Sequence, residues 1–413
     1  MKCLKLFVLL GALTTPGWAQ DAGEAPEQGV ARVSVVSGEV TVRRGDSGEY
    51  VAAELNAPLV SLDHLLTEID SRAEIQLDWA NFIRLAPESE VSLAELKDRD
   101  FLIQVSGGTA TFRVLRDSNS QLEISTPTLA VRPRQPGTYR VTVRDDGSTL
   151  VTVRAGEAEI FAGGTTDILR AGQTLLVTDP ANPQRFLTAA IGRDEWDRWN
   201  ESRDKDLERS NSYQYVSRDI YGVEALNGYG RWVYDAPYGW VWVPSVAVDW
   251  APYRVGRWTW VNYYGWTWVS GDPWGWAPYH HGRWYYASRY GWVWYPGEIR
   301  VRNYWRPALV AFFGWGTNLG WVALAPYEVY RPWYGPGRTI VNNVTYVTNV
   351  NVIGNYKNAR FISGRTGVTS VVHNDFGRRN ITINNYVVAR DRDLRQGSDA
   401  GRWLSNAPSR EHR

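Results

Sequence analysis

A cassette of 26 residues, rich in tryptophan, tyrosine, glycine and proline, recurs in register between residues 230 and 294. A Gly-Arg-Trp motif begins at Gly230, Gly256 and Gly282, and a Tyr-Gly-Trp-x-Trp motif begins at Tyr238, Tyr264 and Tyr290. A third motif, Trp-Ala-Pro-Tyr, occupies residues 250–253 and 276–279 with the same step. Similarity at a fixed period of this length indicates a supersecondary unit that packs against copies of itself. The chain is therefore expected to contain an array of small, equivalent units.

Each cassette is expected to form a β-hairpin. In the first copy, residues 231–234 and 240–242 flank a turn that contains proline and glycine. Side chains in a strand alternate between two faces, so the aromatic residues of each strand share one face. The Trp-Ala-Pro-Tyr motif predicts a third extended segment at an edge, because its proline lacks a backbone donor. Gly256 and Gly282 are predicted to occupy turn positions with positive φ.

The aromatic residues of this array are the candidate ligand-binding residues, because flat aromatic faces stack on sugars, nucleobases and quaternary amines. If every ring were exposed, the apolar patch would far exceed that of a soluble monomer, so we expect one row buried and another open. The candidate platform comprises Trp240, Trp242, Trp266, Trp268, Trp292, Trp294, Tyr253 and Tyr279, with Arg231, Arg257 and Arg283 beside it. The alternative is that the rings are only the core of the hairpins and the arginines lie across neighbouring rings.

The N-terminus has the pattern of a secretory signal peptide. Lys2 and Lys5 precede the apolar residues 6–13, and small residues in 17–19 predict cleavage after Ala19. A polar leader is expected over residues 20–29. We therefore expect a periplasmic or extracellular protein. No later segment approaches 18 uninterrupted apolar residues, so no transmembrane segment is expected in the mature chain.

Composition excludes several kinds of site. The only cysteine, Cys3, lies in the signal peptide, so the mature chain offers no disulfide, cysteine nucleophile or thiolate metal site. Lys plus Arg number 45 and Asp plus Glu number 44, a net charge of +1 that does not favour nucleic acid as a partner. No cofactor motif is present, and the adjacent His280 and His281 would point to opposite faces of a strand, which makes a poor metal site.

Catalytic motifs are equally scarce. No Gly-x-Ser-x-Gly motif with suitable partners occurs. Asp249 and Asp272 stand beside Trp250 and Pro273, Asp235 stands two residues before Pro237, and all three are predicted to form turns. The sequence therefore favours a protein that is not an enzyme. A glycoside hydrolase with paired carboxylates remains an alternative, because the spacing of such a pair is not visible in sequence.

Residues 30–188 are expected to form an all-β domain, either a sandwich, a barrel or a short solenoid. Residues 33–42 predict two strands around a glycine. Residues 139–143 and 149–153 predict a hairpin around the Asp-Asp-Gly turn at 145–147.

Several pieces of this domain occur in a known order: Leu65–Leu77, Ile83–Ser89, Ser125–Pro127, Pro136–Val141, Val153–Ala158 and Leu169–Gln173. In this order they resemble the FecR domain of bacterial envelope proteins. The resemblance implies a periplasmic β-domain that works by contact with envelope proteins, and the best-known relatives pass a surface signal to a sigma factor. Those relatives carry a cytoplasmic domain and a membrane helix ahead of the β-domain, whereas here it follows the predicted leader. Direct sigma-factor regulation is therefore not expected.

The aromatic cassettes, with their lead-in at residues 210–226, resemble the tryptophan-rich region of unknown function that follows the FecR domain in a group of proteobacterial proteins. They are also similar in style to cell-wall-binding hairpin repeats that hold choline between aromatic rings. The repeat region is assigned to residues 213–336.

Three further segments complete the predicted organisation. Residues 193–212 predict a charged helical linker, solvated except for an aromatic stripe of Trp196 and Trp199. Residues 337–390 predict an Asn-rich β segment, and residues 391–413 a disordered tail.

Together these features predict an exported cell-envelope binding or scaffold protein. In this hypothesis the FecR-like domain contacts proteins, while the aromatic repeats stack on envelope polysaccharide or peptidoglycan. The alternative is a signalling or assembly protein that acts only through protein contacts, with the array as a structural core. A glycan hydrolase is the third hypothesis.

Overall fold

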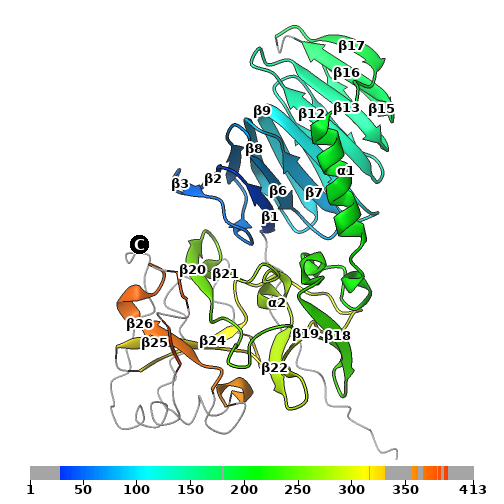
Figure 1. Ribbon diagram of the computed structural model, residues 1–413. Helices are drawn as coiled ribbons and strands as arrows, with labels where there is room; N and C mark the ends of the chain where they lie inside the picture. Colours follow the sequence, from blue (N-terminus) through cyan, green and yellow to red (C-terminus); the bar gives the residue numbers. More distant parts are fainter. Residues whose placement is uncertain are drawn as a thin grey trace, which may run out of the picture.

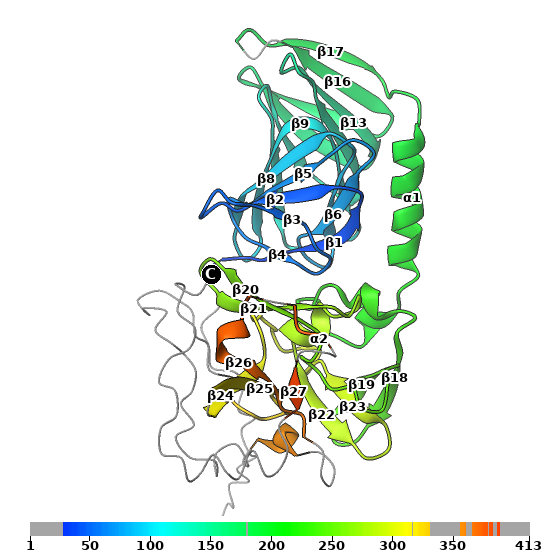
Figure 2. The same cartoon turned by 60° about the vertical axis from the view of Figure 1, so that its left-hand side comes forward.

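The computed structural model describes residues 28–178, 181–315, 317–330, 356–360, 366–378, 380–382 and 386–388. The predicted signal peptide, most of the polar leader, much of the Asn-rich segment and the whole predicted tail lie outside the described residues. The described chain forms a β domain (residues 28–189) and an aromatic domain (residues 210–388). A long helix runs from the first to the second, and the two domains are in contact (Figures 1 and 2).

The strands of the β domain are β1 (Ala31–Ser37), β2 (Val40–Arg43), β3 (Tyr50–Ala52), β4 (Pro58–Leu59), β5 (His64–Thr67), β6 (Arg72–Gln76), β7 (Asn81–Leu85), β8 (Ser89–Leu96), β9 (Asp100–Val114), β10 (Gln121–Ser125), β11 (Ala130–Pro133), β12 (Gly137–Val143), β13 (Thr149–Ala155), β14 (Glu157–Ala162), β15 (Thr165–Arg170), β16 (Gln173–Thr178) and β17 (Gln184–Ala189). The predicted strands at residues 33–42 and the predicted hairpin around 145–147 are confirmed, since β1 and β2 flank Gly38 and β12 pairs with β13.

Two sheets form this domain. One has the order β4-β1-β6-β7-β9-β12-β13-β16-β17. The other has the order β3-β2-β5-β8-β9-β10-β11-β14-β15. Alternate residues of β12, namely Tyr139, Val141 and Val143, enter one continuous hydrophobic core, as the period of a half-buried strand requires. The predicted all-β fold is therefore confirmed.

The long strand β9 belongs to both sheets. Its first part pairs with β8, and residues 108–114 pair with β12. The change of sheet falls at Gly108, whose φ is 75° and whose Cβ position would lie 2.3 Å from the carbonyl oxygen of Glu88. Only glycine tolerates both the conformation and the close approach. Gly108 therefore allows β9 to pass from one sheet to the other.

Helix α1 (Glu195–Glu208) begins at a capping box, in which the side chain of Asp194 accepts from the backbone N–H of Asp197. The rings of Trp196 and Trp199 stack with centroids 4.9 Å apart, and the Trp196 indole N–H donates to Thr111 Oγ1 of β9 at 2.8 Å. The predicted helix and its aromatic stripe are present. The expectation of a largely solvated linker is wrong, because α1 packs along the first sheet (Figure 2).

Buried charges fix α1 to that sheet. The Glu74 carboxylate accepts from Arg84 Nε at 2.8 Å and from Arg203 Nη2 of the helix at 2.9 Å. Arg84 Nη1 also donates to the backbone oxygen of Asn200 at 3.0 Å. Burial raises the pKa of Glu74, but the charges of Arg84 and Arg203, with their hydrogen bonds, lower it to about 2. The carboxylate is thus held ionised in the interior.

The aromatic domain contains β18 (Gly230–Asp235), β19 (Gly239–Pro244), β20 (Gly256–Val261), β21 (Gly265–Ser270), β22 (Arg283–Ala287), β23 (Gly291–Tyr295), β24 (Val310–Trp315), β25 (Asn318–Ala323), β26 (Thr369–Val372) and β27 (Val387–Val388). Short helical turns are η1 (Ser212–Gln214), η2 (Val223–Leu226), α2 (Ala277–His280), η3 (Lys357–Ala359) and η4 (His373–Asp375).

Each cassette forms the predicted hairpin: β18–β19 (hairpin 1), β20–β21 (hairpin 2) and β22–β23 (hairpin 3). Gly256 and Gly282 have the predicted positive φ, at 151° and 66°. The Trp-Ala-Pro-Tyr motif does not form the third strand that was expected. Residues 277–280 form α2 and residues 252–253 form a turn, so each repeat has only two strands. The physical reason is that the first N–H groups of a helical turn make no hydrogen bond within the turn. Proline is therefore tolerated there, and the motif can form a helical turn.

The hairpins do not stack as a regular array. Hairpins 1 and 3 join through the pair Trp242 and Trp294, giving the order β18-β19-β23-β22. Hairpin 2 forms a separate two-stranded sheet, and β24 to β27 form a third sheet beside it. The hairpins therefore do not extend in a line (Figure 1). Tryptophans of all three belong to one buried hydrophobic cluster.

The two domains touch through buried polar contacts as well as apolar ones. The Tyr221 hydroxyl donates to the backbone oxygen of Val30 at 2.5 Å, and Asn56 Nδ2 donates to the backbone oxygen of Asp272 at 3.1 Å. Arg32 pairs with Glu224 at 3.4 Å, with both side chains buried. Among the described residues, none of the helices has the length and apolar character that a membrane span requires.

Candidate functional site

The candidate tryptophans face other aromatic residues across their hairpins. In register lie Trp232 and Trp242, Tyr234 and Trp240, Trp258 and Trp268, Trp260 and Trp266, Trp284 and Trp294, and Tyr286 and Trp292. Each candidate tryptophan thus has an aromatic residue opposite it on the neighbouring strand. Such pairs each contribute roughly 0.2–1 kcal/mol beyond ordinary sheet formation.

Five of these six candidate tryptophans are buried. Trp242, Trp266, Trp268, Trp292 and Trp294 are at most 9% exposed, whereas Trp240 is 42% exposed. The expectation of an open aromatic row is therefore wrong, because segments that follow the third hairpin cover the rings. Phe376, for example, lies edge-to-face on Trp266 with the ring centroids 5.0 Å apart, and Trp321 packs on Trp268.

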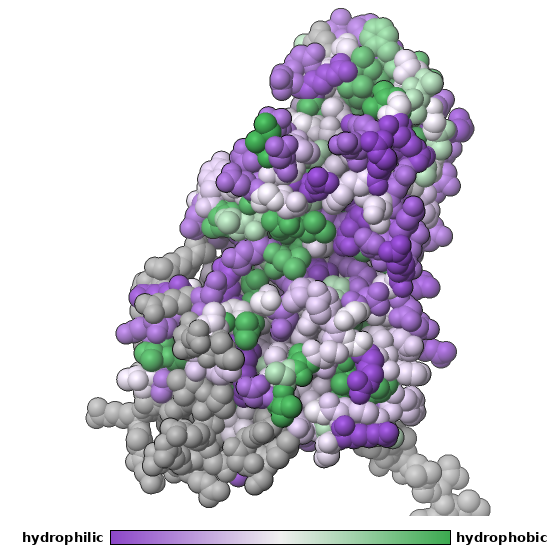
Figure 3. Space-filling model, in the orientation of Figure 1, coloured by the Kyte–Doolittle hydropathy of each residue, from purple (hydrophilic) through white to green (hydrophobic). Residues whose placement is uncertain are grey.

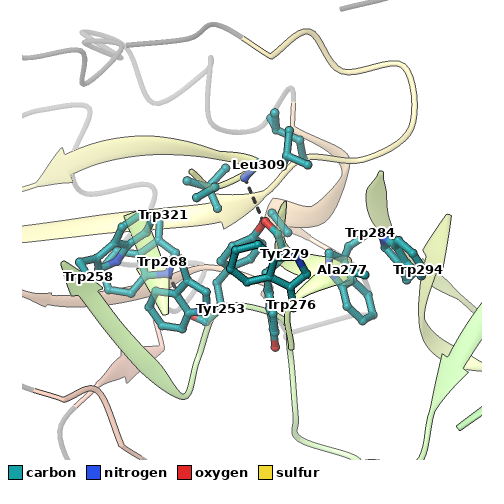
Figure 4. Packing of buried hydrophobic residues seen from close by; sticks show 14 of the residues in the cluster. Tyr253, Trp258, Trp268, Trp276, Ala277, Tyr279, Trp284, Trp294, Leu309 and Trp321 are labelled. Atoms are coloured by element: carbon teal, nitrogen blue, oxygen red, sulfur yellow. Dashed lines mark hydrogen bonds between the residues drawn. The ribbon is translucent and has the colours of Figure 1, made fainter. Parts of the chain in front are cut away.

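Tyr253 and Tyr279 lie at the centre of the interior (Figure 4). The Tyr253 hydroxyl donates to the backbone oxygen of Tyr279 at 2.6 Å and accepts from the N–H of Leu309 at 3.0 Å. The Tyr279 hydroxyl donates to the Asp272 carboxylate at 2.7 Å. Burial raises the pKa of both phenols above the ordinary range. These two tyrosines connect the repeats to each other, and neither presents a face to solvent.

The three repeated arginines have different surroundings. Arg231 is exposed on β18. Arg257 pairs with Glu54 of the β domain at 2.8 Å, and Arg283 donates to the backbone oxygens of Gly282 and Glu328. One repeated position thus contributes to the contact between domains, and the three do not gather at one site.

The adjacent histidines are structural in their contacts. His280 Nδ1 lies 2.7 Å from the backbone oxygen of Arg306, and His281 Nδ1 lies 2.8 Å from Asn303 Oδ1. Burial lowers the pKa of His280 to about 3 and that of His281 to about 4, so both rings are neutral at pH 7. In the described ranges, no group of three His, Cys, Asp or Glu side chains could hold a metal ion.

The carboxylates of the repeats serve local structure. Asp235 accepts from the Tyr285 hydroxyl at 2.5 Å, which links hairpins 1 and 3. Burial raises the pKa of Asp272, whose oxygens accept from Tyr279 and Ser270. Asp249 lies in a turn, as predicted.

A cleft of about 370 Å³ between the domains was not foreseen from the sequence. Its walls include Trp79 and Asp98 from the β domain, and Arg218, Asp219 and Arg302 from the aromatic domain. The Arg218 guanidinium lies over the Trp79 ring at 4.9 Å, and Arg302 pairs with Asp98. These residues come from separated segments without a shared motif, so only the fold brings them together.

Two families match the chain. Residues 63–159 match the family described as FecR protein, and residues 223–328 match a family of unknown function, DUF6600. The first match lies within the β domain, and the second spans all three hairpins together with β24 and β25. No curated protein sequence matches the chain significantly.

Two crystal structures of candidate anti-sigma factors from Parabacteroides distasonis are similar to part of the chain. The first, at 2.50 Å resolution, is 18% identical, covers 31% of this chain and 59% of its own, and has a TM-score of 0.28. The second, at 1.65 Å resolution, is 16% identical, covers 42% of this chain and 94% of its own, and has a TM-score of 0.29. This chain therefore spans less than two thirds of the first structure's length.

Proposed function

We propose that this FecR-domain protein, whose C-terminal region matches a family of unknown function, is an exported regulatory or signalling protein that acts through contacts with other envelope proteins. It is not an enzyme in this proposal. In this proposal the aromatic repeats form a buried structural core, and the partner binds the β domain.

The burial of the candidate rings carries this proposal. A ligand platform needs open ring faces, and five of the six candidate tryptophans are at most 9% exposed. Buried aromatic rings each remove roughly 150–250 Å² from water, which explains their number without a ligand. The match to the FecR family supports a regulatory class for the β domain.

The far end of the β domain offers a surface for a partner. Every residue of β17 is exposed, including Phe186 and Leu187, and Figure 3 shows hydrophobic side chains at this end. Among the described strands β17 pairs only with β16, so its other edge keeps unpaired backbone groups. Such an edge accepts a strand from another protein, with main-chain hydrogen bonds giving affinity. We propose a β-strand of an envelope protein as the occupant.

Photo-crosslinking in the source organism tests this contact. A photoreactive residue at position 187 is expected to crosslink to an envelope protein, and one at the exposed position of Tyr50 in β3 is not. The captured protein, once purified, should bind the wild-type chain at least tenfold more tightly than a Phe186→Ser, Leu187→Ser variant. Tyr50→Ser is the matched control and should bind like wild type. Absence of a crosslink at 187, or equal affinity for all three chains, contradicts the proposal.

Export is part of the same proposal and rests on the predicted signal peptide. Deletion of residues 2–19 should leave the protein in the cytoplasm, whereas the intact chain should fractionate with the periplasm or the medium. Fractionation followed by immunoblotting measures this. Equal distribution of both chains would remove the envelope partner from consideration.

Binding of an envelope glycan or peptidoglycan is the second candidate, favoured by the exposure of Trp240 and its neighbour Tyr234. Co-sedimentation of the chain with purified peptidoglycan tests it, with Trp240→Ala as the variant and Tyr50→Ala as the control. Loss of sedimentation in Trp240→Ala alone would favour this candidate.

A further inference from the structure

One geometry recurs in all three hairpins. The pairs Tyr234–Trp240, Trp260–Trp266 and Tyr286–Trp292 lie edge-to-face, with ring centroids 5.9, 5.6 and 5.8 Å apart and interplanar angles of 87°, 89° and 89°. In each pair, a residue of the first strand meets the first tryptophan of the second strand. The three pairs are therefore equivalent surfaces, one repeat apart.

A glycine backbone covers two of these pairs. A Cβ atom at Gly377 would lie 2.2 Å from Cη2 of Trp266, and a Cβ atom at Gly367 would lie 3.0 Å from Cη2 of Trp292. Any side chain at Gly377 would collide with the indole, and one at Gly367 would crowd it. The preferred neighbour of the pair, seen twice in the same molecule, is thus a glycine in a connecting segment that comes from elsewhere in the chain.

An aromatic ring beside the glycine also packs on hairpin 2, and hairpin 1 has an equivalent ring. In hairpin 2, the Phe376 ring lies 5.0 Å from Trp266 and 5.5 Å from Trp258. In hairpin 1, Tyr215 lies 4.8 Å from each of the equivalent rings, Trp240 and Trp232. Tyr215 therefore takes the position of Phe376.

Hairpin 1 differs from hairpins 2 and 3 in the covering glycine. No described glycine lies against Trp240 in the way that Gly377 lies against Trp266. As a result Trp240 is 42% exposed and Tyr234 is 67% exposed, whereas Trp266 is only 9% exposed. Hairpin 1 thus presents to solvent the surface that hairpins 2 and 3 bury.

We propose that the Tyr234–Trp240 pair is a docking site for a glycine-bearing segment of a partner protein. The segment would place its glycine against the Trp240 indole beside Tyr215, as Gly377 lies beside Phe376. Glycine is required because a larger residue would meet the ring, and closure of the pair removes exposed aromatic surface from water. A sugar ring also has apolar faces, but both equivalent pairs in this molecule are covered by peptide backbone. This site is separate from β17 and does not depend on the role of the β domain.

Titration of the full mature chain with a peptide tests the proposal. The probe is Thr-Gly-Val-Thr-Ser-Val, the sequence of residues 366–371, and the control peptide has alanine in place of its glycine. With ¹⁵N-labelled tryptophan, the indole signal of Trp240 is assigned by its absence in Trp240→Phe. We expect this signal to shift saturably with the glycine peptide, and the alanine peptide to bind at least tenfold more weakly.

Two protein variants complete the test. Trp240→Ala should abolish binding of the glycine peptide, and Tyr50→Ala, which removes an exposed ring from β3, should leave it unchanged. Equal binding of the two peptides would overturn the proposal without any change to the protein. A Trp240 signal that ignores both peptides but shifts with a chitin or peptidoglycan oligosaccharide would also overturn it, and would assign the pair to glycan binding.

Discussion

Glu74 and Arg84 form an ion pair in which neither side chain is exposed to solvent, with Oε2 and Nε 2.8 Å apart. Arg203 of α1 adds a second cation to the same carboxylate. Burial of a charge is tolerated only when partners replace its hydration, so these residues stabilise the fold only as a set. The set also ties α1 to the β domain, which gives the helix a structural role beyond that of a connection.

Removal of this carboxylate is therefore expected to be severely destabilising. Glu74→Gln leaves Arg84 buried without its full counter-charge, and the free energy of unfolding should fall by about 3–5 kcal/mol. Urea denaturation followed by circular dichroism measures the loss. Glu95→Gln, which removes the partner of exposed Lys97, is the control and should change stability by no more than about 1 kcal/mol. Similar losses in both variants would contradict the structural role of the buried set.

Acid should destabilise the protein below pH 6.5 because of His280 and His281. Their pKa values in the folded protein are about 3 and about 4, below the ordinary value of 6.5, so the unfolded chain binds more protons between these limits. Stability is fully present above pH 6.5 and is lost as the pH falls toward 4, by roughly 1.4 kcal/mol per pH unit for each histidine. Thermal melts between pH 7 and 4.5 test this.

A matched variant separates the histidines from other groups. His280→Gln, His281→Gln should lose stability at pH 7, but its melting temperature should change less between pH 6.5 and 4.5 than that of wild type. Glu74 adds to the acid destabilisation only below about pH 4.5. Its pKa is lowered from the ordinary value of 4.5 to about 2, so its stabilisation is fully present above pH 4.5 and is lost as the pH falls toward 2. An unchanged slope in the double variant would show that other groups control the acid response.

The hairpins could be predicted from the sequence because their information is local. Alternation of aromatic and aliphatic residues fixes the strand faces, and the step of 26 residues fixes the equivalence of the copies. The positive φ of Gly256 and Gly282 followed from their place before each Arg-Trp. The all-β class of the first domain was predictable in the same way, from its short alternating strands, but the choice among sandwich, barrel and solenoid was not.

Burial of the aromatic rings could not be predicted, because it depends on distant segments. Trp266 is covered by Phe376 and Gly377, which lie more than 100 residues away in the sequence. The sequence of the cassette does not indicate that these residues cover it. The packing of α1 also depends on distant residues. Its charged sequence predicted a solvated helix, but Glu74 and Arg84 of the sheet form hydrogen bonds with it. The exposed Trp240 is the one candidate ring for which the predicted accessibility holds.

Two glycine substitutions should distinguish backbone strain from collision. Gly239 and Gly377 both have positive φ, at 85° and 75°, but a Cβ at Gly239 would meet nothing within 4 Å, whereas one at Gly377 would meet Trp266. Gly239→Ala should lose about 1–2 kcal/mol from the left-handed conformation alone. Gly377→Ala should lose a further 1–3 kcal/mol, roughly, because the covering segment must move off the ring. Chemical denaturation of both variants measures the difference, and equal losses would mean that the segment at 377 contributes little to the fold.

Tryptophans at one repeat position should differ in their contribution to stability according to what covers them. Trp240 and Trp266 are separated by one cassette and have equivalent partners, Tyr234 and Trp260, yet only Trp240 is exposed. Trp266→Ala opens a cavity under Phe376 and Gly377 and should lower the free energy of unfolding by about 3–5 kcal/mol. Trp240→Ala leaves the ring position open to water and should cost only about 1 kcal/mol. Urea denaturation of the two variants, monitored by circular dichroism, measures both values. If Trp240→Ala proved as damaging as Trp266→Ala, hairpin 1 would have to be covered in solution by a further part of the chain, and the pair could not receive a partner.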